Sequence, residues 1–344
     1  MTAHRPVELS VIVPCLNAEG CIATQLEALA RQQWSKPWEV VVSDNGSTDN
    51  SMQIVATFKN ALPGLRIVDS SGLRQSSHAR NVAARAAVGR MLAFCDADDE
   101  VEPGWVAGMG DALSQHDVVH GQIRYDKFSS ASEAEHLARL WEGGLHRKQF
   151  LPHAGSGNLG IRRSVHEAIG GFDERLPRFS DGDYCWRLQL AGYELHYEPK
   201  AIVQCRVARI DRSLRNLFWR GWTAPAADYW SYKKFKPIGV TKDRILPAHR
   251  TFERSVAKWL HTLRRVPWTL VRGDRTERIA WVEDFVMQSG EVYGQVLGRL
   301  RNPCEPYTEK VPRQETTKTV AGGYNPKASA ATRRPDLKEP TPTP

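Results

Sequence analysis

The sequence predicts an α/β fold whose central, mostly parallel sheet is flanked by helices. Two observations predict it. Apolar runs of strand length alternate with segments of helical periodicity over about the first hundred residues, and three of these runs end in clusters of polar residues. Such alternation is typical of parallel sheets that are covered on both faces. Because ligands bind beyond the carboxyl ends of such strands, the polar clusters are expected to meet at one site.

Four strands and three helices are expected in this first part. The run LSVIV predicts a strand that Pro14 ends, and Ile22, Leu26 and Leu29 have helical spacing within 18–33. The alternation then continues with a strand over 39–43, a helix to about Lys59, a strand over 65–68, a helix over 79–88 and a strand over 90–95.

The second half contains clear start and stop signals for helices. Ser164 and Glu167 have the spacing of a capping box and predict a short helix that Gly170 and Gly171 close. A helix over 183–191 and a strand over 201–207 follow, and then amphipathic helices that begin near Leu214, near Val256 and at the possible cap Asp274–Glu277, the last running to about Leu300.

These patterns predict three parts of the chain. Residues 1–208 form the sheet domain, and residues 209–311 form a basic, Trp-rich helical extension. Residues 312–344 are rich in Pro, Thr, Ala and Lys and almost free of large apolar side chains, which predicts a disordered tail.

The positive charge of the chain belongs to the extension. The net charge is +8, but Arg209–Arg301 alone holds 19 Lys and Arg against 9 Asp and Glu, together with six of the eleven tryptophans. Basic helices with Trp and Leu on the other face suit an anionic membrane surface better than nucleic acid, which we do not expect as a partner. Packing against the sheet domain or dimerisation is the alternative, and the oligomeric state is left open.

The cysteines and the N-terminus indicate a cytoplasmic protein, either free or peripheral on the inner face of the membrane. The six cysteines form no CxxC pair and no zinc-binding spacing, so we expect them to be reduced. The start of the chain lacks the long apolar segment of a signal peptide, and no apolar run approaches the length that spans a bilayer.

The segment FCDADDE, residues 94–100, gathers four acidic residues in five positions directly after an apolar run. Crowded carboxylates are tolerable when a divalent cation neutralises them, and oxygen ligands suit Mg²⁺ or Mn²⁺. Asp96 and Asp98 lie two positions apart, so in strand geometry both face the same side. The alternative is a solvated acidic turn.

Six segments, taken in order, resemble family 2 glycosyltransferases with the GT-A fold. The resemblance spans about residues 7–207, and its segments are VIVPCLNAE, VVVSDNGSTDNS, Ala79-Arg80-Asn81, LAFCDADD, SGNLGIRRSVHEAIGGFDERL and SDGDYCWRLQLAGYEL. It implies a Rossmann-like sheet, a nucleotide-sugar donor that is usually UDP-linked, and inversion at the anomeric carbon. The acceptor would be a hydroxyl of a glycan, a glycolipid or a small molecule. The catalytic domain would comprise a nucleotide-binding half, about 7–105, and an acceptor half, about 106–208.

The resemblance also implies roles for residues in the nucleotide-binding half. Pro14, Asn17 and Asp44 would contact the nucleotide, with Asp44 near the base, and Arg80 would lie near the diphosphate. A solvated position at the start of a helix is the alternative for Arg80.

The acidic segment would hold the metal. Asp96 would bind ribose or a metal-bound water, and Asp98 would ligate Mn²⁺ or Mg²⁺ on the diphosphate, with Asp99 as a further candidate. A cation at this place would offset the charge that develops on the departing diphosphate.

The resemblance implies that Asp181 is the general base that deprotonates the acceptor hydroxyl. Relatives usually carry Glu before this Asp, whereas this chain carries Ser180, and a helix N-cap is the alternative role for Asp181. Asp183 in the same segment is a further candidate. So is Asn158, whose glycine-rich loop is implied to form part of the donor-sugar and acceptor wall. The loop also matches a dinucleotide-binding fingerprint but lacks the hydrophobic strand that should precede it.

A second departure is Cys205, which stands where many relatives carry a His that completes the metal site. A thiolate suits Mg²⁺ or Mn²⁺ poorly, so we expect Cys205 to pack and water to fill the coordination. Ser180 and Cys205 together motivate an alternative function, a catalytically impaired nucleotide-sugar-binding relative that acts as a partner or regulator.

Overall fold

The computed structural model describes residues 6–139, 141, 144–146, 150–206, 213–246, 251–265, 274–301 and 303–307. All of these residues fall in one compact unit within Met1–Pro312. The tail predicted for 312–344 lies outside the described residues. The division of the chain at residue 208 stays a prediction.

An eight-stranded sheet runs through the described residues, in the order β3-β2-β1-β4-β7-β6-β8-β5. The predicted α/β architecture is confirmed. Strands β1 to β4 pair in parallel, as do β6 and β8, whereas β7 pairs antiparallel with both β4 and β6, and β5 pairs antiparallel with β8. The strands are β1 (Leu9–Cys15), β2 (Trp38–Asp44), β3 (Arg66–Asp69), β4 (Met91–Cys95), β5 (Glu100–Val101), β6 (Val118–Arg124), β7 (Asn158–Arg162) and β8 (Leu195–Gln204).

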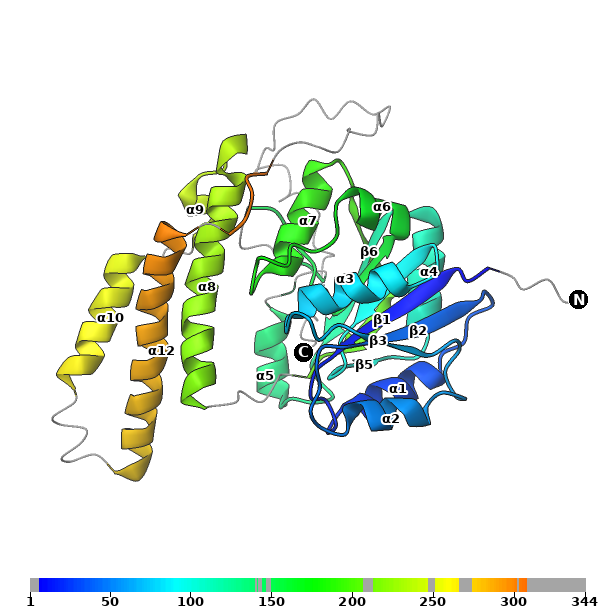
Figure 1. Cartoon of the computed structure of the whole chain (residues 1–344), viewed down its shortest axis with the longest axis horizontal. Helices are drawn as coiled ribbons and strands as arrows, with labels where there is room; N and C mark the ends of the chain where they lie inside the picture. The colour runs from blue at the N-terminus through cyan, green and yellow to red at the C-terminus, as the bar shows by residue number, and fades with distance from the viewer. Residues whose placement is uncertain are drawn as a thin grey trace, which may run out of the picture. The chain divides into compact units, whose positions relative to one another are not determined.

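Helices cover both faces of this sheet because successive strand residues point to opposite sides. Val11 and Val13 of β1 pack in a core with α1, α2 and α4, whereas Ile12 packs in a second core with α3, α6 and α7. Figure 1 shows α1 and α2 on one side of the sheet and α3 on the other. The helices are α1 (Ile22–Ala30), α2 (Ser51–Thr57), α3 (Ser76–Ala86), α4 (Trp105–Gln115), α5 (Ala131–Ala138), α6 (Arg163–Ala168) and α7 (Ser180–Leu190).

Local predictions differ from the structure at Pro14, at Ser164 and at the predicted strand 201–207, since the strand found there, β8, spans Leu195–Gln204. Strand β1 continues through Pro14, which is paired with Ser43 of β2 but lies beyond the last β1 residue paired with β4. A proline is tolerated there because only one neighbouring strand is present. Ser164 does not cap α6, since β7 runs directly into this helix and Arg162 occupies the cap position. The predicted glycine stop is confirmed: Gly170 and Gly171 have φ angles of 78° and 67°.

The predicted amphipathic helices of the extension are confirmed in its described residues. The capping box of the last helix forms, since Asp274 accepts from the Glu277 amide at 2.8 Å and Glu277 accepts from the Asp274 amide at 3.2 Å. Within the described residues, every helix is too short or too polar to span a bilayer. The elements are α8 (Leu214–Phe235), the 3₁₀ helix η1 (Lys236–Ile238), α9 (Lys242–Ile245), α10 (Phe252–Arg264) and α12 (Arg275–Leu300).

Glycines let α12 and α8 approach at backbone distance. Gly290, Gly294 and Gly298 are spaced four residues apart on α12 and face α8, and a Cβ on Gly294 would lie 2.2 Å from the Trp222 carbonyl oxygen. A side chain at these positions would push the helices apart, so this packing depends on the glycines.

Candidate active site

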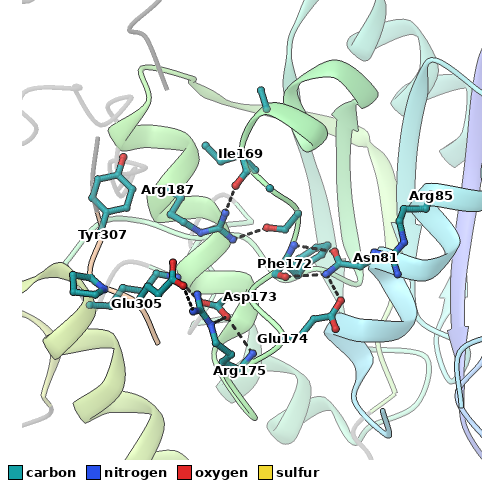
Figure 2. A pocket seen from close by; sticks show the side chains of 15 residues that line it. Asn81, Arg85, Ile169, Phe172, Asp173, Glu174, Arg175, Arg187, Glu305 and Tyr307 are labelled. Atoms are coloured by element: carbon teal, nitrogen blue, oxygen red, sulfur yellow. Dashed lines mark hydrogen bonds and ion pairs between the residues drawn. The ribbon is translucent and has the colours of Figure 1, made fainter. Parts of the chain in front are cut away.

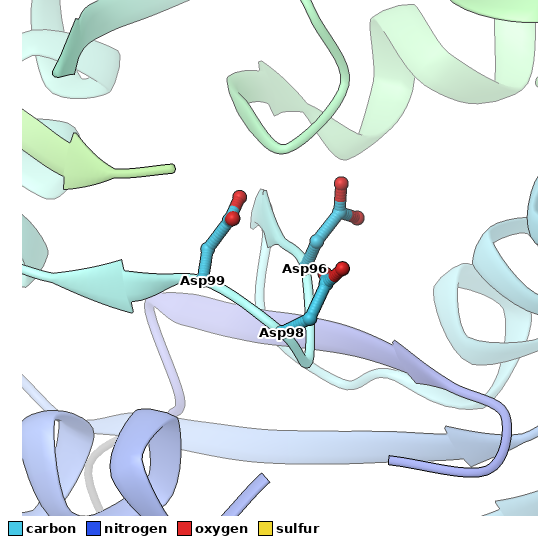
Figure 3. Close-up of side chains that lie close together, drawn as sticks. All are labelled: Asp96, Asp98 and Asp99. Carbon is cyan, nitrogen blue, oxygen red and sulfur yellow. The ribbon is translucent and has the colours of Figure 1, made fainter. Parts of the chain in front are cut away.

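Three carboxylates converge in the short turn between β4 and β5. Asp96, Asp98 and Asp99 each place a carboxylate oxygen within 4.8 Å of the others, and Figure 3 shows all three side chains on the same side of the turn. Burial and the neighbouring Asp96 and Asp98 raise the pKa of Asp99 to about 8, and burial together with Asp96 raises the pKa of Asp98. Hard oxygen donors that repel each other in this way fit a Mg²⁺ or Mn²⁺ ion.

Cationic and polar groups from distant segments surround these carboxylates. The Arg80 side chain of α3 donates to Asp96, and the Arg206 amide donates to Asp99 Oδ1 at 2.8 Å. The Cys205 thiol donates to Asp99 Oδ2 at 3.2 Å, and burial together with Asp99 raises the pKa of this thiol. The thiol contact and the Arg206 amide together hold the Asp99 carboxylate in place.

Buried Gln25 of α1 holds the two ends of the acidic turn. Its amide nitrogen donates to the Asp96 carbonyl at 3.0 Å, and its side-chain oxygen accepts from the Val101 amide at 3.0 Å. Sequence reasoning missed Gln25 and Arg206. The signal for Gln25 was a polar residue inside the apolar stripe of α1, whereas Arg206 had no local signal.

The loops after β1 and β2 are bound to each other beside the acidic turn. Asn17, which has a φ of 50°, accepts from the Thr48 amide at 2.8 Å, and the Ala18 amide donates to Ser51 Oγ at 2.7 Å. Asp44 ends β2 opposite Cys15 and accepts from the Ser47 amide at 2.8 Å. The structure therefore brings the candidates Pro14, Asn17 and Asp44 to one edge of the sheet.

The glycine-rich loop closes against the acidic turn through backbone and not through Asn158. A Cβ on Gly157 would lie 2.7 Å from Asp96 Oδ2. Asn158 is buried at the start of β7, where its side chain accepts from Trp105 Nε1 at 2.8 Å and donates to the Gln122 and Ala201 carbonyls at 2.9 and 3.0 Å. Through these contacts the Asn158 side chain links β7 to α4, β6 and β8.

Asp181 lies in the first turn of α7, and the cap position of this helix is Phe179. One Asp181 oxygen accepts from the Gly182 amide at 2.8 Å. Asp183 is fully buried and pairs with Arg187 at 2.8 Å and with Lys234 of α8 at 2.6 Å. The structure therefore separates the two acidic candidates of this segment, since only Asp181 is open to a ligand.

A hollow of about 600 Å³ is lined by residues of α3, α7 and α8 and by the segment 168–175. Figure 2 shows Asn81 reaching into its wall, where the side-chain amide donates to the Phe172 carbonyl at 2.9 Å and to Glu174 at 2.7 Å. The preceding residue, Arg80, reaches the acidic turn instead. The charges that line this hollow are largely paired with one another, as Arg175 is with Asp173.

Comparison with known proteins shows the family to which this chain belongs. The model of glycosyl transferase family 2 matches residues 10–170. The chain is 30% identical over 217 residues to the glycosyltransferase AglE of Haloferax volcanii, an alignment that covers 61% of this chain and 69% of AglE. It is 25% identical over 249 residues to the succinoglycan biosynthesis protein ExoA of Rhizobium meliloti, which covers 70% and 72% of the two chains.

A solved structure shows the same fold. The mannosyltransferase PcManGT from Pyrobaculum calidifontis, in complex with GDP-Man and Mn²⁺, superposes with a TM-score of 0.51 at 18% identity and covers 86% of this chain and 88% of its own. The predicted GT-A fold is confirmed. On the evidence of AglE and the family model, the chain belongs to glycosyl transferase family 2 and is a glycosyltransferase.

Proposed function

We propose that the protein transfers a sugar, with inversion, from a nucleotide-sugar donor to an acceptor hydroxyl. The observation that carries this proposal is the convergence of Asp96, Asp98 and Asp99 at the carboxyl edge of the sheet, beside the joined loops of Asn17 and Asp44. Clustered carboxylates at this edge suit a cation shared with substrate phosphates. The donor is expected to be a UDP-sugar, and the acceptor a glycan, a glycolipid or a small molecule.

In this proposal one group of residues acts on the leaving diphosphate and Asp181 acts on the acceptor. Asp98 and Asp96 would hold Mn²⁺ or Mg²⁺, which when bound supplies positive charge to the diphosphate. Arg80 adds a second positive charge at Asp96. Asp181 takes the proton of the acceptor hydroxyl as the acceptor oxygen bonds to the anomeric carbon and the bond to the diphosphate oxygen breaks.

Calorimetric binding tests the donor half of the proposal. UDP, GDP, dTDP and CMP are titrated into wild type and Asp98→Asn, each with Mn²⁺ and with EDTA. We expect one nucleotide to bind with Mn²⁺ and to lose binding with EDTA and in the variant. Asp111→Asn, at an exposed position of α4, is the matched control and should bind as wild type does. If no nucleotide binds under any condition, the donor site is refuted.

Asp181→Asn tests the catalytic half. The variant should keep donor binding and lose transfer, because its amide cannot accept the acceptor proton. Turnover equal to that of wild type would refute Asp181 as the base. A wild-type protein that binds donor without any turnover would favour the alternative, a catalytically impaired binding relative.

We also propose a cytoplasmic protein whose extension docks on an anionic membrane surface. Large apolar side chains are exposed along the extension: the exposed fraction is 50% for Ile279 and 79% for Leu300. The stretch Arg209–Arg301 that contains them has a net charge of +10. Exposed apolar faces on basic helices favour an anionic interface. The protein should therefore co-sediment with vesicles that contain phosphatidylglycerol more than with pure phosphatidylcholine, and Ile279→Gln should weaken this. Equal binding to both vesicles would contradict docking.

A further inference from the structure

Arg206 lies at the acidic turn and takes no part in the chemistry described above. It directly follows Cys205, whose thiol contacts Asp99, and its own amide donates to Asp99 Oδ1 at 2.8 Å. Its side chain also contacts the turn, since Nε donates to the Asp98 carbonyl at 3.1 Å. The main chain and the side chain of one residue therefore bind two of the three carboxylate residues, and both contacts fix the guanidinium beside them.

An aromatic ring supports the Arg206 guanidinium from one side. The guanidinium carbon lies 3.8 Å from the centroid of the Phe128 ring, which is a cation–π contact. Phe128 lies in the turn after β6, and the end of this strand is joined to β8 because the Cys205 amide donates to the Arg124 carbonyl at 2.7 Å. Stacking covers one face of the guanidinium and leaves its N–H groups, which lie in the plane, open to a ligand.

The two terminal nitrogens of Arg206 are available for binding. Within the described residues this side chain makes its contacts through Nε and its stacked face, and neither terminal nitrogen has a hydrogen-bond or ion-pair partner there. The side chain is half-buried, so these nitrogens are reached from solvent. Arg80 differs, since it is paired with Asp96 and its side chain is only 5% exposed. Of the two arginines at the turn, Arg206 is therefore the one whose charge is not already paired.

The balance of charge at the turn gives this guanidinium a use. The three carboxylates of the turn, when ionised, are offset by one divalent cation together with Arg80. A diphosphate is an anion, and it gains negative charge as its bond to the sugar breaks. Arg206 adds the charge that makes the site positive, at a position fixed before the substrate arrives. Preorganised charge of this kind stabilises a leaving group without reorganisation.

The guanidinium is also near the loops that are expected to hold the nucleotide. Burial raises the pKa of the Cys21 thiol, the charge of Asp98 raises it further, and the charge of Arg206 lowers it. Cys21 lies at the N-terminus of α1, just after the loop of Asn17 that is bound to the loop after β2. A cation near both the acidic turn and these loops is well placed for a diphosphate, which connects the nucleoside to the sugar.

We propose that Arg206 binds the diphosphate of the nucleotide-sugar donor and stabilises the charge that develops on it as the sugar leaves. Its planar guanidinium can donate two parallel hydrogen bonds to phosphate oxygens, whereas an ammonium is a point charge. Phe128 is a positioning residue that acts through Arg206. The proposal rests on the glycosyltransferase function proposed above and adds a residue to its donor site.

Calorimetry with a graded series of ligands tests this role. The ligands are uridine, UMP, UDP and inorganic pyrophosphate, each with Mg²⁺, and the same series of another base is used if that base binds in place of uracil. The variants are Arg206→Gln, which removes the charge, Arg206→Lys, which keeps it without the planar donors, and Phe128→Leu. Arg124→Gln is the matched control, because Arg124 lies at the end of β6 in an ion pair of 3.7 Å with Glu102. The Mn²⁺ affinity of each variant is measured without nucleotide by electron paramagnetic resonance.

Arg206→Gln should weaken the binding of UDP and pyrophosphate about ten- to a hundredfold, since hydrogen bonds to charged groups contribute about 1.5–3 kcal/mol. UMP should lose less, and uridine should bind as it does to wild type. Arg206→Lys should recover part of the loss. Phe128→Leu should weaken UDP binding about two- to fivefold, since a cation–π contact contributes about 0.5–1 kcal/mol. Arg124→Gln should bind every ligand as wild type does, and no variant should bind Mn²⁺ more weakly.

Two results would overturn the proposal. One is Arg206→Gln binding UDP and pyrophosphate as tightly as wild type does. The other is an equal loss of uridine binding or a parallel loss of Mn²⁺ affinity in that variant, because either would make Arg206 a support of the acidic turn alone. A wild type that binds pyrophosphate through Arg206 but binds no nucleotide would instead refute the nucleotide-sugar donor and confirm Arg206 as a diphosphate ligand.

Discussion

Replacing Lys234 with Met should cost about 3 kcal/mol of the free energy of unfolding. The Lys234 ammonium lies 2.7 Å from Asp173 and 2.6 Å from Asp183, and all three side chains are at most 5% exposed. Breaking a buried ion pair costs about 3–5 kcal/mol because a charge stays buried without its partner. The low end applies here, since Asp173 keeps Arg175 at 2.8 Å and Asp183 keeps Arg187 at 2.8 Å.

Urea unfolding followed by circular dichroism measures this loss. Lys236→Met is the matched control, because Lys236 is exposed on η1 and its replacement should change stability by less than about 0.5 kcal/mol. Adding Asp183→Asn to the Lys234 variant should recover part of the loss, with a coupling of at least about 1 kcal/mol. A loss below about 1 kcal/mol in Lys234→Met would refute the reasoning, since it would mean that the carboxylates do not depend on α8.

Three further predictions concern a buried histidine and two glycines. Burial and the nearby Arg187 lower the pKa of His166 to about 4, and the ring lies 2.7 Å from the Tyr184 hydroxyl. Because this value lies below the unfolded one, the stabilisation is complete above about pH 6.5 and is lost, by up to about 3 kcal/mol, as the pH falls toward 4. His166→Gln should flatten this fall in urea unfolding at stepped pH, and an unchanged slope would contradict the assignment. Gly294→Ala should lower stability by about 1–3 kcal/mol in spite of its better helix propensity, because its Cβ would lie 2.2 Å from the Trp222 carbonyl; an unchanged melting temperature would contradict this. Gly157→Ala should weaken Mn²⁺-dependent nucleotide binding about tenfold at an unchanged melting temperature, since its Cβ would displace the Asp96 carboxylate. Wild-type affinity in that variant would show that the turn has room to adjust.

Features that depend on neighbouring residues were predictable from the sequence. The run before Asp96 is apolar at every position, so a buried strand and its polar end could be located without any partner segment. The loops of Asn17 and Asp44 were expected to meet because parallel strands bring their carboxyl ends to one edge. The cap of α12 was visible as Asp274 and Glu277 at the right spacing.

Features that depend on distant segments were not predictable. Strand β5 has two residues, too few for any periodicity, and exists because β8 pairs with it. Asp183 carried much the same local signal as Asp181, but it is buried in ion pairs with Arg187 of its own helix and with Lys234 of a later helix. The start of α7 was expected at Asp183, three residues late. The cap position has a left-handed conformation, but it is occupied by Phe179, and a phenylalanine does not predict such a conformation as a glycine or asparagine would.

The pairing of β5 with β8 also has a consequence for the order in which the protein folds. Asp99 receives the Cys205 thiol and the Arg206 amide from positions 106 and 107 residues further along the chain. Closing a loop of that length costs about 4 kcal/mol of chain entropy before the contacts form. During synthesis, strands β1 to β4 can assemble while the acidic turn still lacks the strand that shapes it. We therefore expect the proposed metal site to form late, after β8 has been synthesised, and a nascent chain that ends before residue 206 to lack the contacts that hold Asp99.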